Sequence, residues 1–186
     1  SVITSIGLDH LDWLPKNEQN IKKIIYEKTS NLLNSNIIVA KQSSSEITNH
    51  IKKTISKNTS QKIFFNEDYS CSLRENNFFY YEDKINGMKL PIPNVNGEFQ
   101  LENIATAIAT LRSGIQLDLR EEHIKSGITK INNLARLQEI TEGKLKDLVK
   151  NNRLLVDGSH NPLGAKVLNE YLKSLDCNKH IILGMM

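Results

Sequence analysis

At 186 residues, with 39% hydrophobic and 24% charged residues, the chain has the composition of a globular protein of one domain or one and a half. Its net charge of +3 is small and its lysines are scattered singly or in pairs, which excludes nucleic acid as a primary partner. No apolar run approaches the roughly 20 residues that span a bilayer, and Cys71 and Cys177 lack metal-site or disulfide spacing, which predicts a reducing cytoplasm.

The first part of the chain alternates between strand-like and helix-like segments. The residue pattern predicts strands at 1–6, 36–40 and 62–65, and helices at 17–33 and 45–56. In the second helix Ile47, Ile51 and Ile55 recur four residues apart, which places them on one face. Strands that alternate with helices predict an α/β fold with a parallel sheet.

A different pattern follows. Residues 69–93 contain the aromatic run 78–81 and the hairpin signal Asn86-Gly87, which predicts an antiparallel excursion added to the parallel sheet. Helices are expected at 98–114, which is rich in alanine, and at 120–128. After a connector at 134–140, residues 154–186 read as strand, turn, helix and strand.

The turn at 157–162, Asp-Gly-Ser-His-Asn-Pro, is the strongest candidate for a ligand site. It follows the apolar run 154–156 and precedes the helix-like stretch 163–175. Such a turn places polar side chains and free N–H groups at the carboxyl end of a strand, where open α/β sheets bind ligands. Asp157, His160 and Asn161 supply a carboxylate, an imidazole and a carboxamide.

His10 and Lys28 are weaker candidates. His10 follows the first strand, where a neutral imidazole can bind a divalent metal, although a polar pair such as Asp9-His10 is more often a cap or a surface loop. Lys28 lies beside Glu27 in a predicted helix, and an isolated helical lysine is usually a solvated charge. A chemical role for Lys28 requires it to face a cleft with a lowered pKa.

Gln100, Asn103 and Arg136 also have two interpretations each. A carboxamide at a helix start caps exposed N–H groups, or it supplies the donor and acceptor pair that matches a purine edge. Arg136, in the connector, is either an ordinary ion-pair partner or a phosphate clamp between domains.

The order of these motifs is more specific than any one of them. The chain contains, in sequence, Ser-Ile-Gly-Leu-Asp-His at 5–10, Glu27-Lys28, Gln-Leu-Glu-Asn-Ile-Ala-Thr-Ala at 100–107, Ala-Arg-Leu-Gln at 135–138, the 157–162 turn and Leu-Gly-Met-Met at 183–186. Together they resemble the folylpolyglutamate synthase/dihydrofolate synthase family of the Mur ligase superfamily, over essentially the whole chain.

The resemblance implies a fold and two domains. Residues 1–134 would form the C-terminal part of the central ATP-binding domain, a mostly parallel sheet with an antiparallel excursion. Residues 135–186 would form the linker and the first part of a Rossmann-like C-terminal glutamate-ligase domain.

The resemblance also implies an ATP-dependent ligase. The carboxylate of folate or dihydropteroate attacks the γ-phosphate of ATP, and the amine of L-glutamate then displaces phosphate from the acyl phosphate. Mg²⁺ and cationic side chains must neutralise the developing charge. We expect a cytoplasmic monomer that binds no nucleic acid and no membrane, either alone or with a complementary N-terminal segment.

Individual roles follow by position. The residue matching His10 binds Mg²⁺, and the lysine matching Lys28 is carbamylated. The asparagine matching Asn103 lies at the nucleotide, and the arginine matching Arg136 reaches the ATP phosphates. Gln100 is expected, from its carboxamide, to bind the nucleotide as well. The residues matching Asp157 and His160 complete the nucleotide and glutamate sites when the domains close.

Several features depart from the family pattern. The Gly-rich loop that ends in Gly-Lys-Ser or Gly-Lys-Thr and cradles the ATP phosphates is not among these 186 residues, nor is the family's upstream metal-binding glutamate. Thr29-Ser30 replaces the usual Ala-Gly, and Phe99 replaces a common His. The alternative hypothesis is therefore a truncated, catalytically inactive remnant or subunit fragment, and we expect the isolated chain not to turn over ATP.

Overall fold

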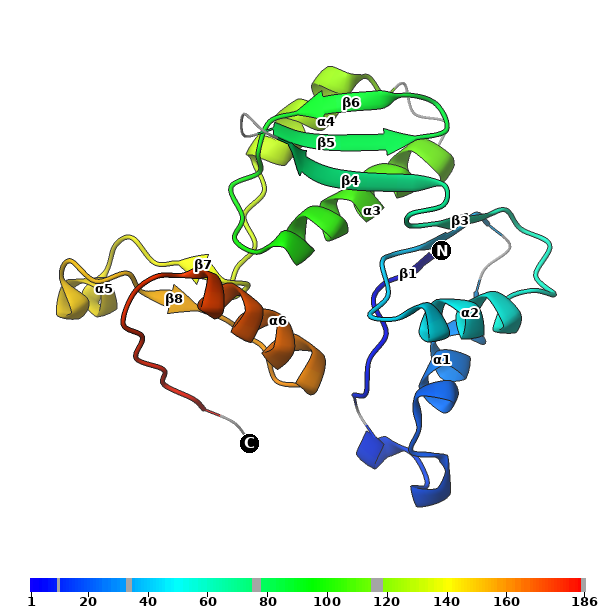
Figure 1. Ribbon diagram of the computed structural model, residues 1–186, viewed down its shortest axis with the longest axis horizontal. Coiled ribbons are helices and arrows are strands. Elements are labelled where there is room, and N and C mark those ends of the chain that lie inside the picture. Colours follow the sequence, from blue (N-terminus) through cyan, green and yellow to red (C-terminus); the bar gives the residue numbers. More distant parts are fainter. Residues whose placement is uncertain (10, 33–34, 75–77, 115–118, 185–186) are drawn as a thin grey trace. The chain divides into compact units, whose positions relative to one another are not determined.

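The computed structural model describes the chain except for residues 10, 33–34, 75–77, 115–118 and 185–186. The chain forms two compact units, whose elements are labelled in Figure 1. Unit 1 comprises residues 1–94 and 98–131, and unit 2 comprises residues 95–97 and 132–186. Among the helices described in either unit, none has the length and apolar character required to cross a membrane.

Unit 1 contains the predicted parallel sheet, in the order β1 (Val2–Ile3), β2 (Ile37–Val39) and β3 (Lys62–Phe64). Helices α1 (Ile21–Thr29) and α2 (Ser45–Thr54) connect successive strands, as parallel pairing requires. All three residues of the central strand β2 are buried, which is typical of a strand covered on both faces.

Helix α1 is shorter than the predicted 17–33. The side chain of Asn20 accepts a hydrogen bond from the N–H of Lys23 and caps the helix at this point. Lys16–Glu18 forms a separate 3-10 turn.

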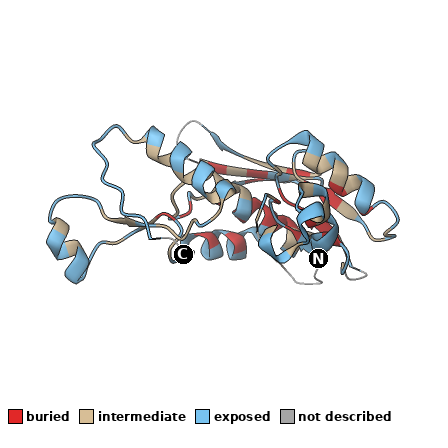
Figure 2. Cartoon of the chain, turned by 90° about the horizontal axis from the view of Figure 1, so that it is seen from below, coloured by how far each residue is buried: buried red, intermediate tan, exposed pale blue. Residues whose placement is uncertain are grey.

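Apolar residues from this sheet and from α1 and α2 form one core. In unit 1 the buried residues lie along the strands and within the helices that pack on them (Figure 2). The isoleucine spacing that predicted α2 places Ile51 and Ile55 in this core, with Ile47 packed against it. Its buried members are Ile3, Ile6, Ile24, Ile25, Ile37, Val39, Ile51, Ile55 and Phe64.

The predicted antiparallel segment is confirmed and forms a separate sheet. Its strands are β4 (Tyr69–Arg74), β5 (Phe78–Asp83) and β6 (Gly87–Leu90), in that order. The β5–β6 hairpin turns at the predicted Asn86-Gly87, where Asp83 accepts hydrogen bonds from the N–H groups of Ile85 and Asn86.

Helix α3 (Glu98–Gly114) has the predicted bounds, and α4 (Glu121–Thr129) differs from its prediction by one residue at each end. Helix α3 packs against β2, β4 and β5. The hydroxyl of Tyr69 lies 3.1 Å from the Val39 carbonyl oxygen and 3.0 Å from the Thr106 hydroxyl. Burial raises the pKa of Tyr69 to about 12, so the neutral hydroxyl joins both sheets to α3.

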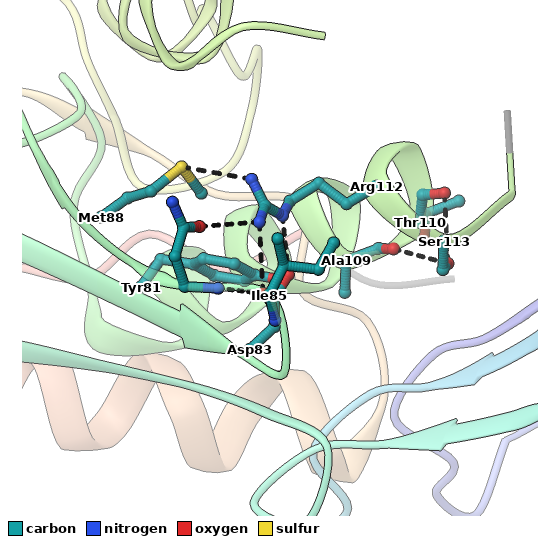
Figure 3. A network of polar contacts seen from close by, with 9 residues as sticks. Tyr81, Asp83, Ile85, Met88, Ala109, Thr110, Arg112 and Ser113 are labelled. Carbon is teal, nitrogen blue, oxygen red and sulfur yellow. Dashed lines mark hydrogen bonds and ion pairs between the residues drawn. The ribbon is translucent and has the colours of Figure 1, made fainter. Parts of the chain in front are cut away.

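The C-terminal end of α3 is fixed by a largely buried ion pair (Figure 3). Arg112 Nε and Asp83 Oδ2 are 2.7 Å apart, and the two side chains are 11% and 12% exposed. Arg112 also donates to Asn86 Oδ1 over 2.8 Å, and the Tyr81 hydroxyl donates to Asp83 over 3.0 Å. Although burial opposes ionisation, these hydrogen bonds hold the pKa of Asp83 below its ordinary 3.8.

We expect Asp83→Asn to lower the free energy of unfolding of unit 1 by about 3 kcal/mol, because it leaves a largely buried guanidinium without its counter-ion. A depressed folded-state pKa stabilises the protein above the unfolded-state pKa, so this contribution is lost as the pH falls from 3.8 through the folded-state pKa. Urea unfolding as a function of pH measures both effects.

The matched control is Glu67→Gln, which removes an exposed carboxylate 2.6 Å from Lys52 and should change stability by less than about 1 kcal/mol. Two outcomes would contradict a structural role for the Asp83–Arg112 pair. One is an equal loss of stability in the two variants, and the other is a loss of stability at acidic pH that is the same in Asp83→Asn as in the wild type.

Unit 2 contains a small antiparallel pair, β7 (Gln138–Glu139) with β8 (Leu155–Val156), and the helices α5 (Lys144–Val149) and α6 (Pro162–Ser174). The strand at 155–156 and the helix after the turn were predicted. The prediction of a plain connector at 134–140 is wrong in part, because Gln138 and Glu139 pair with β8. Their polar residue types gave no strand signal.

Two further differences concern the rest of unit 2. Helix α5 was not predicted, since it is only six residues long and begins after Gly143 without a side-chain cap. The prediction of a final strand is wrong for the described residues 175–184, which contain no strand. Ile182 is 98% exposed there, and an apolar run becomes a strand only where a neighbouring edge supplies hydrogen bonds.

Candidate functional site

The turn after β8 is organised by the carboxylate of Asp157. Its Oδ1 accepts a hydrogen bond of 2.8 Å from the N–H of Ser159, two residues on, which is the geometry of an Asx turn. Its Oδ2 accepts a second bond of 2.8 Å from the N–H of Leu137, 20 residues earlier. One side chain thus shapes its own turn and ties the 135–138 segment to it.

That segment has an unusual backbone. Ala135 and Leu137 have φ angles of 52° and 49°, in the left-handed region, which costs a non-glycine residue about 1–2 kcal/mol. Arg136 lies between them. We call residues 135–137 the kink.

The backbone groups of both left-handed residues have partners. The N–H of Ala135 bonds Gln138 Oε1 at 2.9 Å, and its carbonyl accepts from the N–H of Gly158 at 2.8 Å. The N–H of Leu137 bonds Asp157, and its carbonyl accepts from Asn96 Nδ2 at 2.8 Å. These four bonds stabilise the kink. A buried backbone group without a partner would cost about as much free energy as a lost hydrogen bond.

The kink presents Arg136 beside Gly158. Arg136 is exposed, and its Nη1 donates to the Ala135 carbonyl at 3.1 Å. A Cβ atom added at Gly158 would lie 2.6 Å from Nη1 and 3.3 Å from the Ala135 oxygen. The absence of a side chain at residue 158 therefore allows the guanidinium to lie over the turn.

His160 is oriented by the same turn. Its Nδ1 lies 2.9 Å from the carbonyl oxygen of Gly158. Since a carbonyl oxygen can only accept, Nδ1 carries the proton, and in the neutral ring Nε2 is the acceptor. His160 is exposed, so this nitrogen is accessible to a ligand.

The turn ends at the start of α6. The side chain of Asn161 accepts from the N–H of Gly164 at 2.8 Å, and Pro162 occupies the first turn of the helix. The structure thus brings Arg136, Asp157 and His160 together in unit 2. A guanidinium, an oriented imidazole and a nearby helix N-terminus form an arrangement suited to an anionic ligand.

Two of the predicted residues of unit 1 lie on α3. Gln100 is buried, with 2% of its surface exposed, whereas Asn103 is exposed one turn later. Between them Glu102 forms an ion pair of 2.5 Å with Lys41, and the hydrogen bond that Lys41 donates to Glu102 raises the pKa of Lys41. Sequence reasoning missed this pair, since Lys41 is distant in sequence from α3.

Lys28 lies in the last turn of α1 and is exposed. Its neighbour Glu27 forms an ion pair with Lys23 at 3.0 Å, one helical turn earlier. The predicted metal ligand His10 lies outside the described residues. Among the residues that are described, no three His, Cys, Asp or Glu side chains gather in a group that could hold a metal ion.

A separate depression lies at the carboxyl ends of β2 and β3. Its volume is about 290 Å³, and its lining consists of Ala40, Lys41, Gln42, Ser44, Ser45, Thr48, Asn49, Phe64, Phe65, Asn66 and Glu67. None of the predicted site residues lines it. The Ser44 hydroxyl already caps α2 by accepting from the N–H of Ile47.

We expect Gly158→Ala to displace the Arg136 side chain while it leaves unit 2 folded. The added methyl group meets the end of a flexible side chain and one carbonyl oxygen at a tight but tolerable distance, so the cost in stability should be about 1 kcal/mol. NMR of the arginine Nε–Hε group and thermal unfolding measure the two effects.

Gly127→Ala in α4 is the control, because a Cβ there has open space around it and should stabilise the helix by about 0.5–1 kcal/mol. An unchanged Arg136 Nε–Hε signal in Gly158→Ala would show that the guanidinium does not lie over the turn.

The chain resembles known proteins in sequence and in fold. No family model matches the chain. The chain is 24% identical over 188 residues to the dihydrofolate synthase/folylpolyglutamate synthase of Escherichia coli (strain K12), covering 100% of the chain and 40% of that protein. It therefore spans about two fifths of the length of this relative.

Solved structures give the same picture. FolC of E. coli in complex with DHPP and ADP is 27% identical with a TM-score of 0.74, covering 96% of this chain and 39% of that one. The apo form of L. casei FPGS is 23% identical with a TM-score of 0.73, covering 95% of this chain and 42% of that one. At that identity the second likeness bears on the fold alone.

Proposed function

We propose that this chain, which resembles the folylpolyglutamate synthase/dihydrofolate synthase family over its whole length, is part of an ATP-dependent ligase that joins L-glutamate to folate or dihydropteroate. The observation that carries the proposal is the kink that presents Arg136 beside the 157–160 turn. A solved relative is a complex with DHPP and ADP, and another is a complex of FPGS with AMPPCP and folate.

The two parts of the chain take different roles. We assign residues 1–134 to the C-terminal part of the central ATP-binding domain, and residues 135–186 to the linker and the first part of the glutamate-ligase domain. The division of the chain into compact units near residue 131 supports this assignment.

The reaction is a transfer between anions. A carboxylate oxygen of the folate or dihydropteroate attacks the γ-phosphorus of ATP, the bond from the γ-phosphorus to the bridging oxygen breaks, and ADP leaves. The glutamate amine then attacks the carbonyl carbon of the acyl phosphate, phosphate departs and the nitrogen loses a proton. Positive charge near the phosphoryl group is therefore the main requirement.

Arg136 supplies such a charge. Its guanidinium is permanently protonated and can donate two parallel hydrogen bonds to a phosphate. Because Ala135 and Leu137 fix the backbone on either side, fewer conformations are lost when the side chain binds. Asn103, exposed on α3, and the buried Gln100 are proposed to bind and support the nucleotide base.

His160 is proposed to act at the amine. With Nδ1–H on the Gly158 carbonyl, its Nε2 can accept a hydrogen bond, and then a proton, from the attacking nitrogen. Lys28 is proposed to act as a carbamate, which would convert an exposed cation into an anion.

Magnesium is proposed from the resemblance alone. A bound Mg²⁺ would neutralise phosphate charge, and His10 is its proposed ligand. The described residues contain no cluster of side chains that could hold this ion. No step of the reaction is therefore assigned to a metal.

We expect the natural-length gene product that contains this chain to release phosphate from ATP only when glutamate and a folate or dihydropteroate are both present. The isolated 186-residue chain should release none, because it has no Gly-Lys-Ser or Gly-Lys-Thr loop to cradle the phosphates. Arg136→Ala in the natural-length product should lower kcat/KM by about 100-fold. A coupled phosphate assay measures these rates.

Phosphate release that does not depend on glutamate would reject the ligase in favour of an ATPase. A natural-length product without any release would favour the inactive remnant, and substrate-dependent release by the isolated chain would refute the need for the missing loop.

We expect Lys28→Ala in the natural-length product to reduce this activity by at least about 100-fold, since a positioned charge is removed, and His10→Ala to do the same. Lys22→Ala is the matched control, because Lys22 is an exposed lysine of the same helix. Mass spectrometry in bicarbonate buffer should detect a carbamate on Lys28 and not on Lys22. A wild-type rate in Lys28→Ala would refute the carbamate role of Lys28, and a wild-type rate in His10→Ala would refute magnesium binding by His10.

A further inference from the structure

We propose that Gln42 is a positioning residue, whose carboxamide replaces a backbone rung between β1 and β2 and fixes residues 4–6 at the carboxyl edge of the parallel sheet. The inference rests on the proposed function, because the fixed segment leads in the sequence to His10, the proposed magnesium ligand. Gln42 lies just beyond β2 and is not among the residues that the sequence singled out.

The first step is where the backbone ladder between β1 and β2 ends. The N–H of Ile38 donates to the Ser1 carbonyl at 3.0 Å, and one rung further the N–H of Ala40 donates to the Ile3 carbonyl at 2.9 Å. Bonds in a parallel pair are evenly spaced, so the next donor along β1 would meet the Ala40 carbonyl oxygen. Strand β1 ends at Ile3, and this oxygen therefore needs another donor.

The Gln42 side chain supplies that donor. Its Nε2 lies 2.9 Å from the Ala40 carbonyl oxygen and 3.2 Å from that of Thr4. Its Oε1 accepts a hydrogen bond from the N–H of Ile6 over 2.9 Å. A carboxamide carries the same kinds of donor and acceptor as a peptide unit. It therefore continues the ladder with one side chain after the two backbones have separated.

The bond to Ile6 is the one that burial makes costly to lose. Ile6 is 5% exposed and belongs to the core beneath the parallel sheet. A buried N–H without a partner costs the full free energy of its desolvation, which exceeds the net worth of an ordinary hydrogen bond. Packing thus fixes the side chain of Ile6, and Gln42 fixes its N–H.

The residues that follow β2 reach two segments with proposed ligand residues. Gln42 holds residues 4–6, and its neighbour Lys41 forms an ion pair of 2.5 Å with Glu102. Glu102 precedes Asn103 on α3. Because open α/β sheets bind ligands at the carboxyl ends of their strands, Gln42 sets how the chain leaves β1 at the edge where a ligand is proposed to bind.

The direct test is amide hydrogen exchange in the 186-residue chain. Gln42→Met keeps the length of the side chain and removes the carboxamide, so it should speed exchange of the Ile6 N–H by about tenfold or more. Gln61→Met, at an exposed glutamine beside β3, should leave this exchange unchanged. Unchanged Ile6 exchange in Gln42→Met overturns the proposal.

A second measurement needs no variant. NMR detects scalar coupling across a hydrogen bond, and the wild-type chain should show coupling between the Ile6 amide nitrogen and the carboxamide carbon of Gln42. Coupling from the Ala40 nitrogen to the Ile3 carbonyl carbon is the internal reference, because both bonds are 2.9 Å long. If Gln42→Met fails to fold, this coupling still decides the matter, and its absence beside a visible reference overturns the proposal.

The functional readout is the magnesium dependence of phosphate release by the natural-length gene product. Gln42→Met should raise the magnesium concentration for half-maximal release by about tenfold, the effect expected when the support of a metal ligand is removed. At saturating magnesium kcat should stay within about twofold of the wild type, since the lost interaction acts on binding. Gln61→Met should change neither quantity.

The possible failures are distinguishable. Faster Ile6 exchange with an unchanged magnesium requirement, or a loss of kcat alone, would show a purely structural residue and overturn the positioning role. A wild-type product that releases no phosphate in response to glutamate would reject the proposed function. The exchange and the coupling would then still decide whether Gln42 holds residues 4–6.

Discussion

The carboxylate of Asp157, shared between two backbone N–H groups, is the constraint on which the candidate site depends. One bond closes the turn after β8, and the other reaches back to Leu137. The N–H of Gly158 adds a further bond between the turn and the kink, to the carbonyl of Ala135. With both bonds of Asp157 in place, the orientation of His160 on the Gly158 carbonyl and the placement of Arg136 follow from one carboxylate.

Burial is what makes this bond necessary. Leu137 is the one fully buried side chain that the described part of unit 2 contains, and its burial favours the kink by about 1.5–3 kcal/mol. The left-handed backbone at Leu137 costs a comparable amount. Neither term decides the conformation, so the outcome depends on whether the Leu137 N–H and carbonyl find partners, and Asp157 and Asn96 supply them.

This balance explains what the sequence predicts and what it does not. The bounds of α3 follow from local spacing, and the 157–162 turn follows from an aspartate and an asparagine that bond residues two or three positions away. The kink depends on partners 20 and 41 residues away. Nothing in Ala-Arg-Leu-Gln itself favours a positive φ, so the segment reads as a plain connector and Asn96 goes unnoticed.

The same reasoning separates two arginines that look alike in the sequence. The guanidinium of Arg112 bonds the Asp83 carboxylate and Asn86, and 11% of its side chain is exposed. Arg112 therefore joins the β5–β6 hairpin to α3. Arg136 lies next to a carboxylate that is committed to the backbone instead, and its guanidinium is exposed. A carboxylate that bonds an arginine neutralises its charge, whereas one that bonds the adjacent main chain places the charge and leaves it unneutralised. Which of the two an arginine has is a property of the folded backbone, and it distinguishes a structural arginine from one that can bind a phosphate.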